Sequence, residues 1–200
     1  PVFPNISVCD VKADAVIDFS NAKAVDDLLI YCEEKQVPVV LCTTGLSEVQ
    51  LAKVKQVSGH VAVLKSANMS LGINMLMELL KKAALTLAPA GFDMEIVEKH
   101  HNQKVDAPSG TAIALADSIN EVMGNTYHYK YDRSATREKR DAKEIGIQAI
   151  RGGTIVGEHD VIFAGQDEVI TFNHTAYSKA IFAKGAVQAA KFLAGKPEGR

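Results

Sequence analysis

The chain has 200 residues, of which 47% are hydrophobic and 23% charged, an ordinary globular composition with enough length for one large domain or two small ones. Its net charge of −2, without a dominant basic stripe, argues against a nucleic-acid partner. No apolar run is long enough to span a bilayer and the first residues lack the features of a signal peptide, so we expect a cytoplasmic protein without a membrane partner.

Three short apolar runs in the first seventy residues, 15–19, 37–42 and 61–64, predict buried strands, and the continuous run 37–42 is typical of a strand that is buried on both faces. Apolar residues recur at helical spacing between the first two runs, and a capping-box pattern at Ser47 and Gln50 marks the start of a second helix. This order predicts parallel strands joined by right-handed helical crossovers, which is one half of a doubly wound, Rossmann-like nucleotide-binding fold.

The carboxyl ends of the predicted parallel strands are where such a sheet binds its ligand. The segments at these ends are Asp18, Phe19 and Ser20 after the first strand, Cys42, Thr43 and Thr44 after the second, and Ser66, Ala67, Asn68 and Met69 after the third. The spacing of the three cysteines, Cys9, Cys32 and Cys42, fits neither a disulfide framework nor a zinc site. We therefore expect the three cysteines to be small core residues of a protein in a reducing compartment.

A second group of elements follows, with helices expected over 71–87 and 111–122, strands over 93–100, 145–150, 155–163 and 169–175, and a final helix over 179–193. Because glycine-containing turns separate the last three strands, they predict an antiparallel meander. The stretch 133–144 alternates in charge and is typical of a solvated loop or helix face.

These elements predict an α/β protein with two domains. The first, a parallel α/β domain, comprises residues 1–69 and 180–200, and the second, a domain with a mixed α+β sheet, comprises residues 70–179. Helices cover only one face of the second sheet, so an oligomer is the simplest cover for the other face.

The segment from Glu98 to Thr111 has the highest density of chemically useful side chains. His100 and His101 can exchange protons near neutral pH, and Lys104 supplies a cation. Ser109 is a predicted N-cap, and the helix that follows it offers backbone N–H groups to an anion. A proton donor, a cation and an anion cradle in one loop predict a site for a small, negatively charged substrate.

With these motifs in order along nearly the whole chain, the sequence resembles the 4-hydroxy-tetrahydrodipicolinate reductase (dihydrodipicolinate reductase) family. The segments that carry the resemblance are 18–20, 43–45, 67–68, 98–111, 151–153 and 156–159, and the His-His-x-x-Lys-x-Asp-Ala-Pro-Ser-Gly-Thr motif within them is highly specific.

The resemblance implies reduction of the dehydrated 4-hydroxy-tetrahydrodipicolinate to tetrahydrodipicolinate by NADH or NADPH, in diaminopimelate and lysine biosynthesis. It implies that His100 is a proton donor or acceptor, that Lys104 is a proton donor, and that His101 binds substrate. Gly110 and Thr111 would hold a substrate carboxylate, and the strand-end segments of the first domain would contact the cofactor. The family is usually homotetrameric through its mixed-sheet domain, and the choice between NADH and NADPH stays open.

Two departures from the family pattern affect cofactor binding. The chain has no G-x-G-x-x-G motif and looks shortened at both ends, with the first βα unit missing, so we expect an incomplete doubly wound sheet and weakened dinucleotide affinity. The family often has glycine where this chain has Cys42, so we expect an altered backbone approach to the cofactor.

Two alternatives remain at this point. The first is a non-catalytic module, derived from this reductase, that binds a small dicarboxylate. The second is a metal-dependent hydrolase, which is disfavoured because adjacent histidines on a strand point to opposite faces. Outside the motif, we expect polar or partly buried roles for His60, His128, His159 and His174, a carboxylate or hairpin role for Arg151, and a weaker cofactor-phosphate role for Lys179.

Overall fold

A computed structural model describes residues 2–197 and divides the chain into two compact units. The first unit comprises residues 1–69 and 182–200, and the second comprises residues 70–181. The second crossing between the units therefore lies two residues later than the predicted boundary at 179/180. No helix in the described part of the chain is long and apolar enough to cross a membrane.

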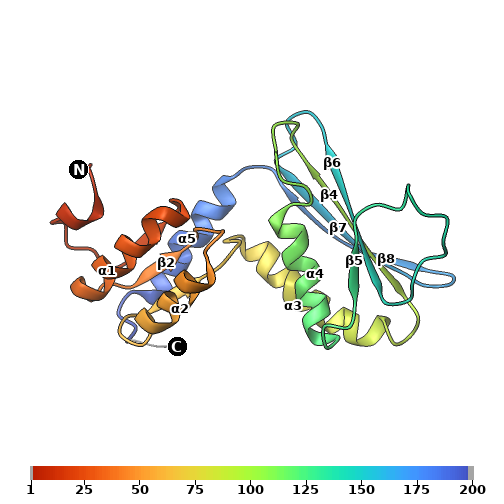
Figure 1. Ribbon diagram of the computed structural model, residues 1–200, viewed down its shortest axis with the longest axis horizontal. Helices are drawn as coiled ribbons and strands as arrows, with labels where there is room; N and C mark the ends of the chain where they lie inside the picture. The colour runs from red at the N-terminus through yellow and green to blue at the C-terminus, as the bar shows by residue number, and fades with distance from the viewer. Residues whose placement is uncertain (1, 198–200) are drawn as a thin grey trace. The chain divides into compact units, whose positions relative to one another are not determined.

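The first unit is built on a parallel sheet with the strand order β1-β2-β3. Its strands are β1 (Val16–Asp18), β2 (Val39–Leu41) and β3 (Val63–Lys65). Its helices are η1 (Ile6–Val8), η2 (Ala22–Ala24), α1 (Val25–Lys35), α2 (Glu48–Val57) and most of α5 (Ala180–Leu193), as Figure 1 shows. The strands are parallel, as predicted, and the predicted capping box of Ser47 and Gln50 starts α2.

The alternation of side chains along β2 separates the core of the first unit into two layers. Val39 and Leu41 pack with α1 and α2, whereas Val40 on the other face packs with α5. This three-layer arrangement is the expected one for parallel strands with helices on both faces.

The second unit is a mixed five-stranded sheet with the order β5-β6-β4-β7-β8. Its strands are β4 (Asp93–His100), β5 (His128–Lys130), β6 (Glu144–Arg151), β7 (Gly157–Ala164) and β8 (Val169–Ala176). Strand β4 pairs in parallel with β6 and antiparallel with β7, and β7 pairs antiparallel with β8.

The predicted antiparallel meander is therefore wrong for β6, because β4 lies between β6 and β7. The alternation of apolar residues identifies each strand and its buried face, but it does not specify which edge of a neighbour the strand joins. Strand β5 was not predicted, since three residues are too few to show a period.

Two helices, α3 (Leu71–Leu87) and α4 (Gly110–Val122), cover one face of this sheet (Figure 1). Strand β4 has every second residue buried, which places Met94, Ile96, Glu98 and His100 on the helix-covered face. The apolar core thus ends, toward the carboxyl end of β4, in two ionisable side chains.

The charged stretch 133–144 is a loop as far as residue 143, which is one of the two expected forms, but its arginines are not simply solvated. Arg140 contacts the carboxylates of Asp93 and Glu95 at 2.8 Å and 3.0 Å and donates to the backbone carbonyls of Met94 and Glu144. Arg133 also pairs with Glu95 and Glu144. The loop is therefore anchored on β4 and β6 at the face of the sheet opposite Glu98.

Candidate functional site

The carboxylate of Glu98 is the centre of a buried polar cluster in the second unit. Its side chain is 0% exposed and accepts hydrogen bonds from Arg151 Nη1 at 2.8 Å and Nη2 at 2.7 Å, one to each oxygen. It also accepts the backbone N–H of Ser109 at 2.9 Å and contacts His100 Nδ1 at 2.6 Å. Burial would raise the pKa of Glu98, but the bonds from Arg151, His100 and Ser109 outweigh it and hold the pKa below its ordinary value.

His100 lies two residues beyond Glu98 on the same face of β4 and is 8% exposed. Burial lowers the pKa of His100, and this effect outweighs the opposing effect of the Glu98 carboxylate. Lys104 and Arg151 lower the pKa further, so the imidazole is neutral at neutral pH. A Cβ on Gly157 would lie 3.1 Å from His100 Nε2, so glycine leaves room for the ring.

His159 is a second buried histidine, paired with Glu98 in the β4–β7 register. Its ring meets that of His100 edge to face, with centroids 5.2 Å apart, and its Nε2 lies 3.1 Å from Ser109 Oγ. Burial, followed by the field of His100, lowers the pKa of His159 to about 4. His159 is therefore neutral at neutral pH.

Ser109 connects this cluster to α4. Its Oγ accepts the Ala112 N–H at 3.1 Å, which confirms the predicted N-cap, while its own N–H binds Glu98. A Cβ on the next residue, Gly110, would meet no atom within 4 Å, and Thr111 is half-buried. Helix α4 therefore begins directly beside the Glu98 cluster, and no other atom of the described chain fills the space next to Gly110.

Lys104 lies in the loop that links β4 to α4, a loop that includes a cis Ala107–Pro108 bond. Its Nζ pairs with Asp106 at 2.8 Å, and this ion pair lowers the pKa of Asp106. The backbone N–H of Lys104 binds the carbonyl of His101, whose side chain is half-buried. The loop thus brings Lys104 within electrostatic range of His100.

Three residues of the Glu98 cluster were not identified from the sequence. Glu98 has no predicted role of its own, and the predictions for Arg151 and His159 are open. The i, i+2 spacing of Glu98 and His100 on a strand was a usable signal, because such residues share a face. The contacts of Arg151 and His159 had no local signal, since they depend on pairing with β6 and β7.

In the first unit, the predicted cofactor segments lie at the adjacent carboxyl ends of β1, β2 and β3. Asp18 is buried and joins two of these segments, accepting from Thr43 Oγ1 at 2.6 Å and from Ser20 N at 3.0 Å. Phe19 is 56% exposed, and Thr44 and Ala67 are also exposed.

Cys42 and Met69 are instead packed inward, in the cluster of side chains against α5. Burial, with a smaller effect from Asp18, raises the pKa of the Cys42 thiol to about 11, so it is an uncharged core residue. A Cβ on Gly185 would lie 1.6 Å from the Met69 carbonyl oxygen, so α5 approaches this segment closely only because residue 185 is glycine. These two side chains support the strand-end segments from behind.

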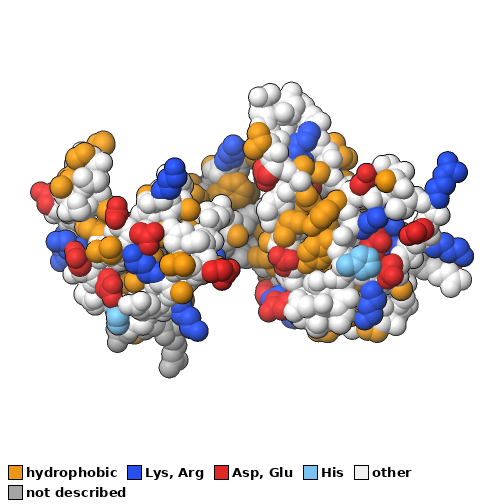
Figure 2. Space-filling model, viewed as in Figure 1, with side chains coloured by type: hydrophobic (Ala, Val, Ile, Leu, Met, Phe, Trp, Pro, Cys, Tyr) orange, Lys and Arg blue, Asp and Glu red, His pale blue; other side chains and the backbone are white. Residues whose placement is uncertain are grey.

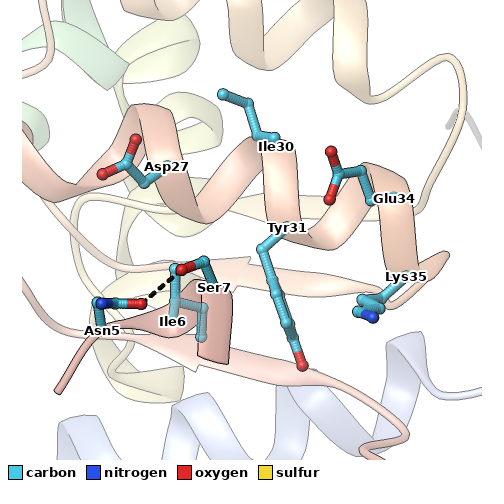
Figure 3. A pocket seen from close by; sticks show the side chains of 8 residues that line it. All are labelled: Asn5, Ile6, Ser7, Asp27, Ile30, Tyr31, Glu34 and Lys35. Carbon is cyan, nitrogen blue, oxygen red and sulfur yellow. Dashed lines mark hydrogen bonds between the residues drawn. The ribbon is translucent and has the colours of Figure 1, made fainter. Parts of the chain in front are cut away.

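A separate cavity of about 420 Å³ lies between α1 and η1 and is shown in Figure 3. Its lining combines polar and charged side chains with Ile6, Ile30 and Tyr31. None of the residues in its lining is a predicted site residue.

Residues 2–197 contain no group of three or more His, Cys, Asp and Glu side chains placed to hold a metal ion. On the face shown in Figure 2, Lys and Arg side chains are interspersed with Asp and Glu side chains. The cluster around Glu98 combines a carboxylate, two imidazoles and a guanidinium, which are groups able to transfer protons or bind an anion.

Comparisons with known proteins agree on one family. Residues 1–69 match the family model described as "Dihydrodipicolinate reductase, N-terminus", and residues 72–200 match "Dihydrodipicolinate reductase, C-terminus". A 4-hydroxy-tetrahydrodipicolinate reductase of Caldanaerobacter subterraneus subsp. tengcongensis is 52% identical over 199 residues, covering 100% of this chain and 78% of the relative. The enzyme of the same name from Clostridium tetani is 51% identical, with 100% and 77% coverage.

Two solved structures are also similar to this chain. The dipicolinate-bound dihydrodipicolinate reductase from Paenisporosarcina sp. TG-14 superposes with a TM-score of 0.74 at 25% identity, covering 92% of this chain and 70% of that one. A probable dehydrogenase from Thermotoga maritima, at 14% identity and a TM-score of 0.51, shares the fold, with coverage of 95% of this chain and 73% of that one.

Proposed function

Because the chain belongs to the dihydrodipicolinate reductase family, we propose that it reduces dehydrated 4-hydroxy-tetrahydrodipicolinate to tetrahydrodipicolinate, with His100 and Lys104 as its proton-transfer groups. This is the 4-hydroxy-tetrahydrodipicolinate reductase reaction of diaminopimelate and lysine biosynthesis, with NADH or NADPH as cofactor. One observation carries the assignment of residues: the loop that follows His100 at the end of β4 contains Lys104 and leads to the N-terminus of α4, and the buried Glu98 carboxylate binds both His100 and Ser109 at its two ends.

The proton-transfer role of His100 follows from its surroundings. Addition of hydride to the substrate ring leaves carbanion character that a general acid must quench. His100 directs Nδ1 to Glu98, so a proton taken up at Nε2 gives an imidazolium whose charge the carboxylate balances. Lys104 adds a second cation beside the negatively charged substrate and serves as a proton donor.

Substrate binding is assigned to His101, Gly110 and Thr111. A helix N-terminus stabilises a carboxylate through its backbone N–H groups and its dipole, and α4 has 13 residues, enough for both contributions. His101, half-buried and directly after β4, supplies a further hydrogen-bonding group in the same loop as Lys104.

Cofactor binding is assigned to the first unit, residues 1–69 and 182–200, and substrate binding to the second unit, residues 70–181. The strand-end segments fit a dinucleotide, because they combine exposed side chains with buried ones that support them. The exposed residues are Phe19, Ser20, Thr44 and Ala67. The buried residues are Asp18, Cys42, Thr43, Asn68 and Met69, and Ser66 is half-buried. When bound, the nicotinamide supplies the hydride. The protein positions the two reactants and polarises the substrate.

We further propose a cytoplasmic homotetramer. The three cysteines are free, which suits a reducing compartment. In the second unit, α3 and α4 cover one face of the five-stranded sheet, and the part of the opposite face that the 133–143 loop does not cover is available to other copies of the chain.

Steady-state oxidation of NADH and NADPH, with 4-hydroxy-tetrahydrodipicolinate generated in the cuvette, tests the proposal. We expect turnover that requires both reactants and that falls about 10²- to 10⁴-fold in His100→Gln, while the exposed-site variant His128→Gln matches the wild type. Calorimetric binding of pyridine-2,6-dicarboxylate without any turnover would support the non-catalytic binding module instead.

A further inference from the structure

The carboxylate of Glu98 joins three segments that are distant in sequence: its own strand, the start of α4 and the end of β6. We propose that Glu98 is a positioning residue for the reduction, which fixes the proton of His100 on Nδ1 and holds the imidazole at a set place relative to the N-terminus of α4. The inference rests on the proposed function, since it takes His100 as the proton-transfer group.

The first step of the argument is that Glu98 is an anion in the folded protein. A carboxyl group with 0% exposure would ordinarily be neutral, but this one faces both terminal nitrogens of Arg151 at 2.8 Å and 2.7 Å. Arg151 is held in turn by the carbonyls of Ile150 and Asp106. The guanidinium therefore cannot turn away, and Glu98 presents two acceptor oxygens and no donor.

The second step concerns the tautomer of His100. A carboxylate only accepts, so the 2.6 Å contact with Nδ1 requires the proton to reside on that nitrogen. Nε2 is left as the atom that exchanges protons, on the side where Gly157 has no side chain to obstruct it. The other charged or titratable groups that face the ring are Lys104, Arg151 and His159, so Glu98 is its anionic neighbour.

The third step concerns distance. The oxygen of Glu98 that accepts from Ser109 N belongs to the same carboxylate that binds His100, and Arg151 also holds the carbonyl of Asp106. Both ends of the loop from 101 to 109 are thus tied to one ion pair. A substrate held by the N–H groups of α4 would meet the imidazole at a separation that Glu98 determines.

Glu98→Gln is the variant that tests this role, because it removes the charge and keeps the size. We expect kcat to fall about 10- to 100-fold and the limb of the kcat/KM pH profile that reports His100 to move down by about one pH unit, since the anion that favours the imidazolium is gone. Nitrogen-15 NMR of the histidines should show the Nδ1–H tautomer in the wild type and a mixture in Glu98→Gln.

Glu95→Gln is the matched control. Glu95 lies on the same strand, faces the opposite side of the sheet and is also held by two arginines, Arg133 and Arg140. We expect Glu95→Gln to lose stability comparably while it leaves the pH limb and the His100 tautomer unchanged. A purely structural role for Glu98 predicts that the two variants behave alike, which would overturn the proposal.

The tautomer measurement on the unmodified chain keeps the proposal testable even if Glu98→Gln does not fold. A proton on Nε2 of His100 in the wild type at neutral pH would overturn it. Wild-type protein that shows the Nδ1–H tautomer but does not oxidise NADH or NADPH with the substrate would instead contradict the proposed function, so the two failures are distinguishable.

Discussion

The paired charges of Lys104 and Asp106 show how a single residue can be held ready for an anion. Within residues 2–197, Lys104 has one carboxylate partner, Asp106 at 2.8 Å, whose side chain is 53% exposed. An exposed ion pair of this kind is weak, so a dicarboxylate substrate can compete for the ammonium group.

Lys104→Gln should therefore lower kcat/KM about 100-fold, because it removes a cation and a proton donor from the loop. Asp106→Asn should change kcat/KM by less than about 3-fold, since breaking an exposed ion pair frees Lys104 at little cost. Steady-state kinetics of the two variants make the comparison. Equal losses in both variants would show that the ion pair, and not the cation, is what the site requires.

His159 predicts a pH dependence of stability at the same scale. Its pKa is about 4 in the folded protein, against 6.5 for an ordinary imidazole, so the unfolded chain binds the proton more readily. As far as His159 is concerned, the free energy of unfolding is highest above pH 6.5. It decreases by about 3 kcal/mol as the pH falls toward 4, because the unfolded chain takes up the proton first.

Urea unfolding between pH 7 and pH 4 measures this loss. We expect His159→Gln to reduce the slope of unfolding free energy against pH, and His128→Gln, at an exposed position, to retain the wild-type slope. A wild-type slope in His159→Gln would show that other buried groups account for the acid sensitivity.

At the scale of elements, the two serine caps of α2 and α4 are formed alike but have different surroundings. Ser47 and Ser109 each accept a backbone N–H of the first helical turn. Ser47 is exposed, whereas Ser109 is buried and its hydroxyl also contacts His159. Only the α4 cap therefore belongs to the candidate site.

Ser109→Ala and Ser47→Ala should each destabilise the protein by about 1 kcal/mol, the usual cost of losing a cap. Only Ser109→Ala should also weaken the binding of pyridine-2,6-dicarboxylate, because it alters the N-terminus of α4 beside the Glu98 cluster. Denaturant unfolding and calorimetry separate the two effects. Unchanged binding in Ser109→Ala would argue against the carboxylate site at Gly110 and Thr111.

At the scale of the whole molecule, the chain consists of two units with separate cores, and α5 completes the core of the first unit. The contact of Gly185 with the Met69 carbonyl fixes α5 behind a strand-end segment assigned to the cofactor. The substrate residues all lie in the other unit. Binding of the two ligands should therefore respond separately to changes in α5.

Gly185→Ala should weaken dinucleotide binding and leave pyridine-2,6-dicarboxylate binding unchanged, because a Cβ at 1.6 Å from a backbone oxygen forces α5 to shift. Val187→Ala, at a position on the same helix that is 47% exposed, is the control and should affect neither ligand. Fluorescence titration with NADH and calorimetry with the dicarboxylate provide the two readouts. Loss of dicarboxylate binding in Gly185→Ala would contradict the assignment of the ligands to separate units.

The sequence by itself determined the features that depend on neighbouring residues. Apolar periodicity predicted α3 from Leu71 to about Leu87, a serine before a helix predicted the caps at Ser47 and Ser109, and three apolar runs predicted the parallel pairing of β1, β2 and β3. These features are local, because helical and strand periods and capping bonds form between residues a few positions apart.

Only the tertiary structure decided the contacts on which the candidate site depends. Arg151 binds Glu98 across 53 positions and Ser109 contacts His159 across 50, and both contacts exist because β4 lies between β6 and β7. Strand order and register set these neighbours, and a pattern of alternating apolar residues carries no information about either partner edge. In the predicted meander, β7 would pair with β6 and β8 only, so His159 on β7 could not have paired with Glu98 on β4.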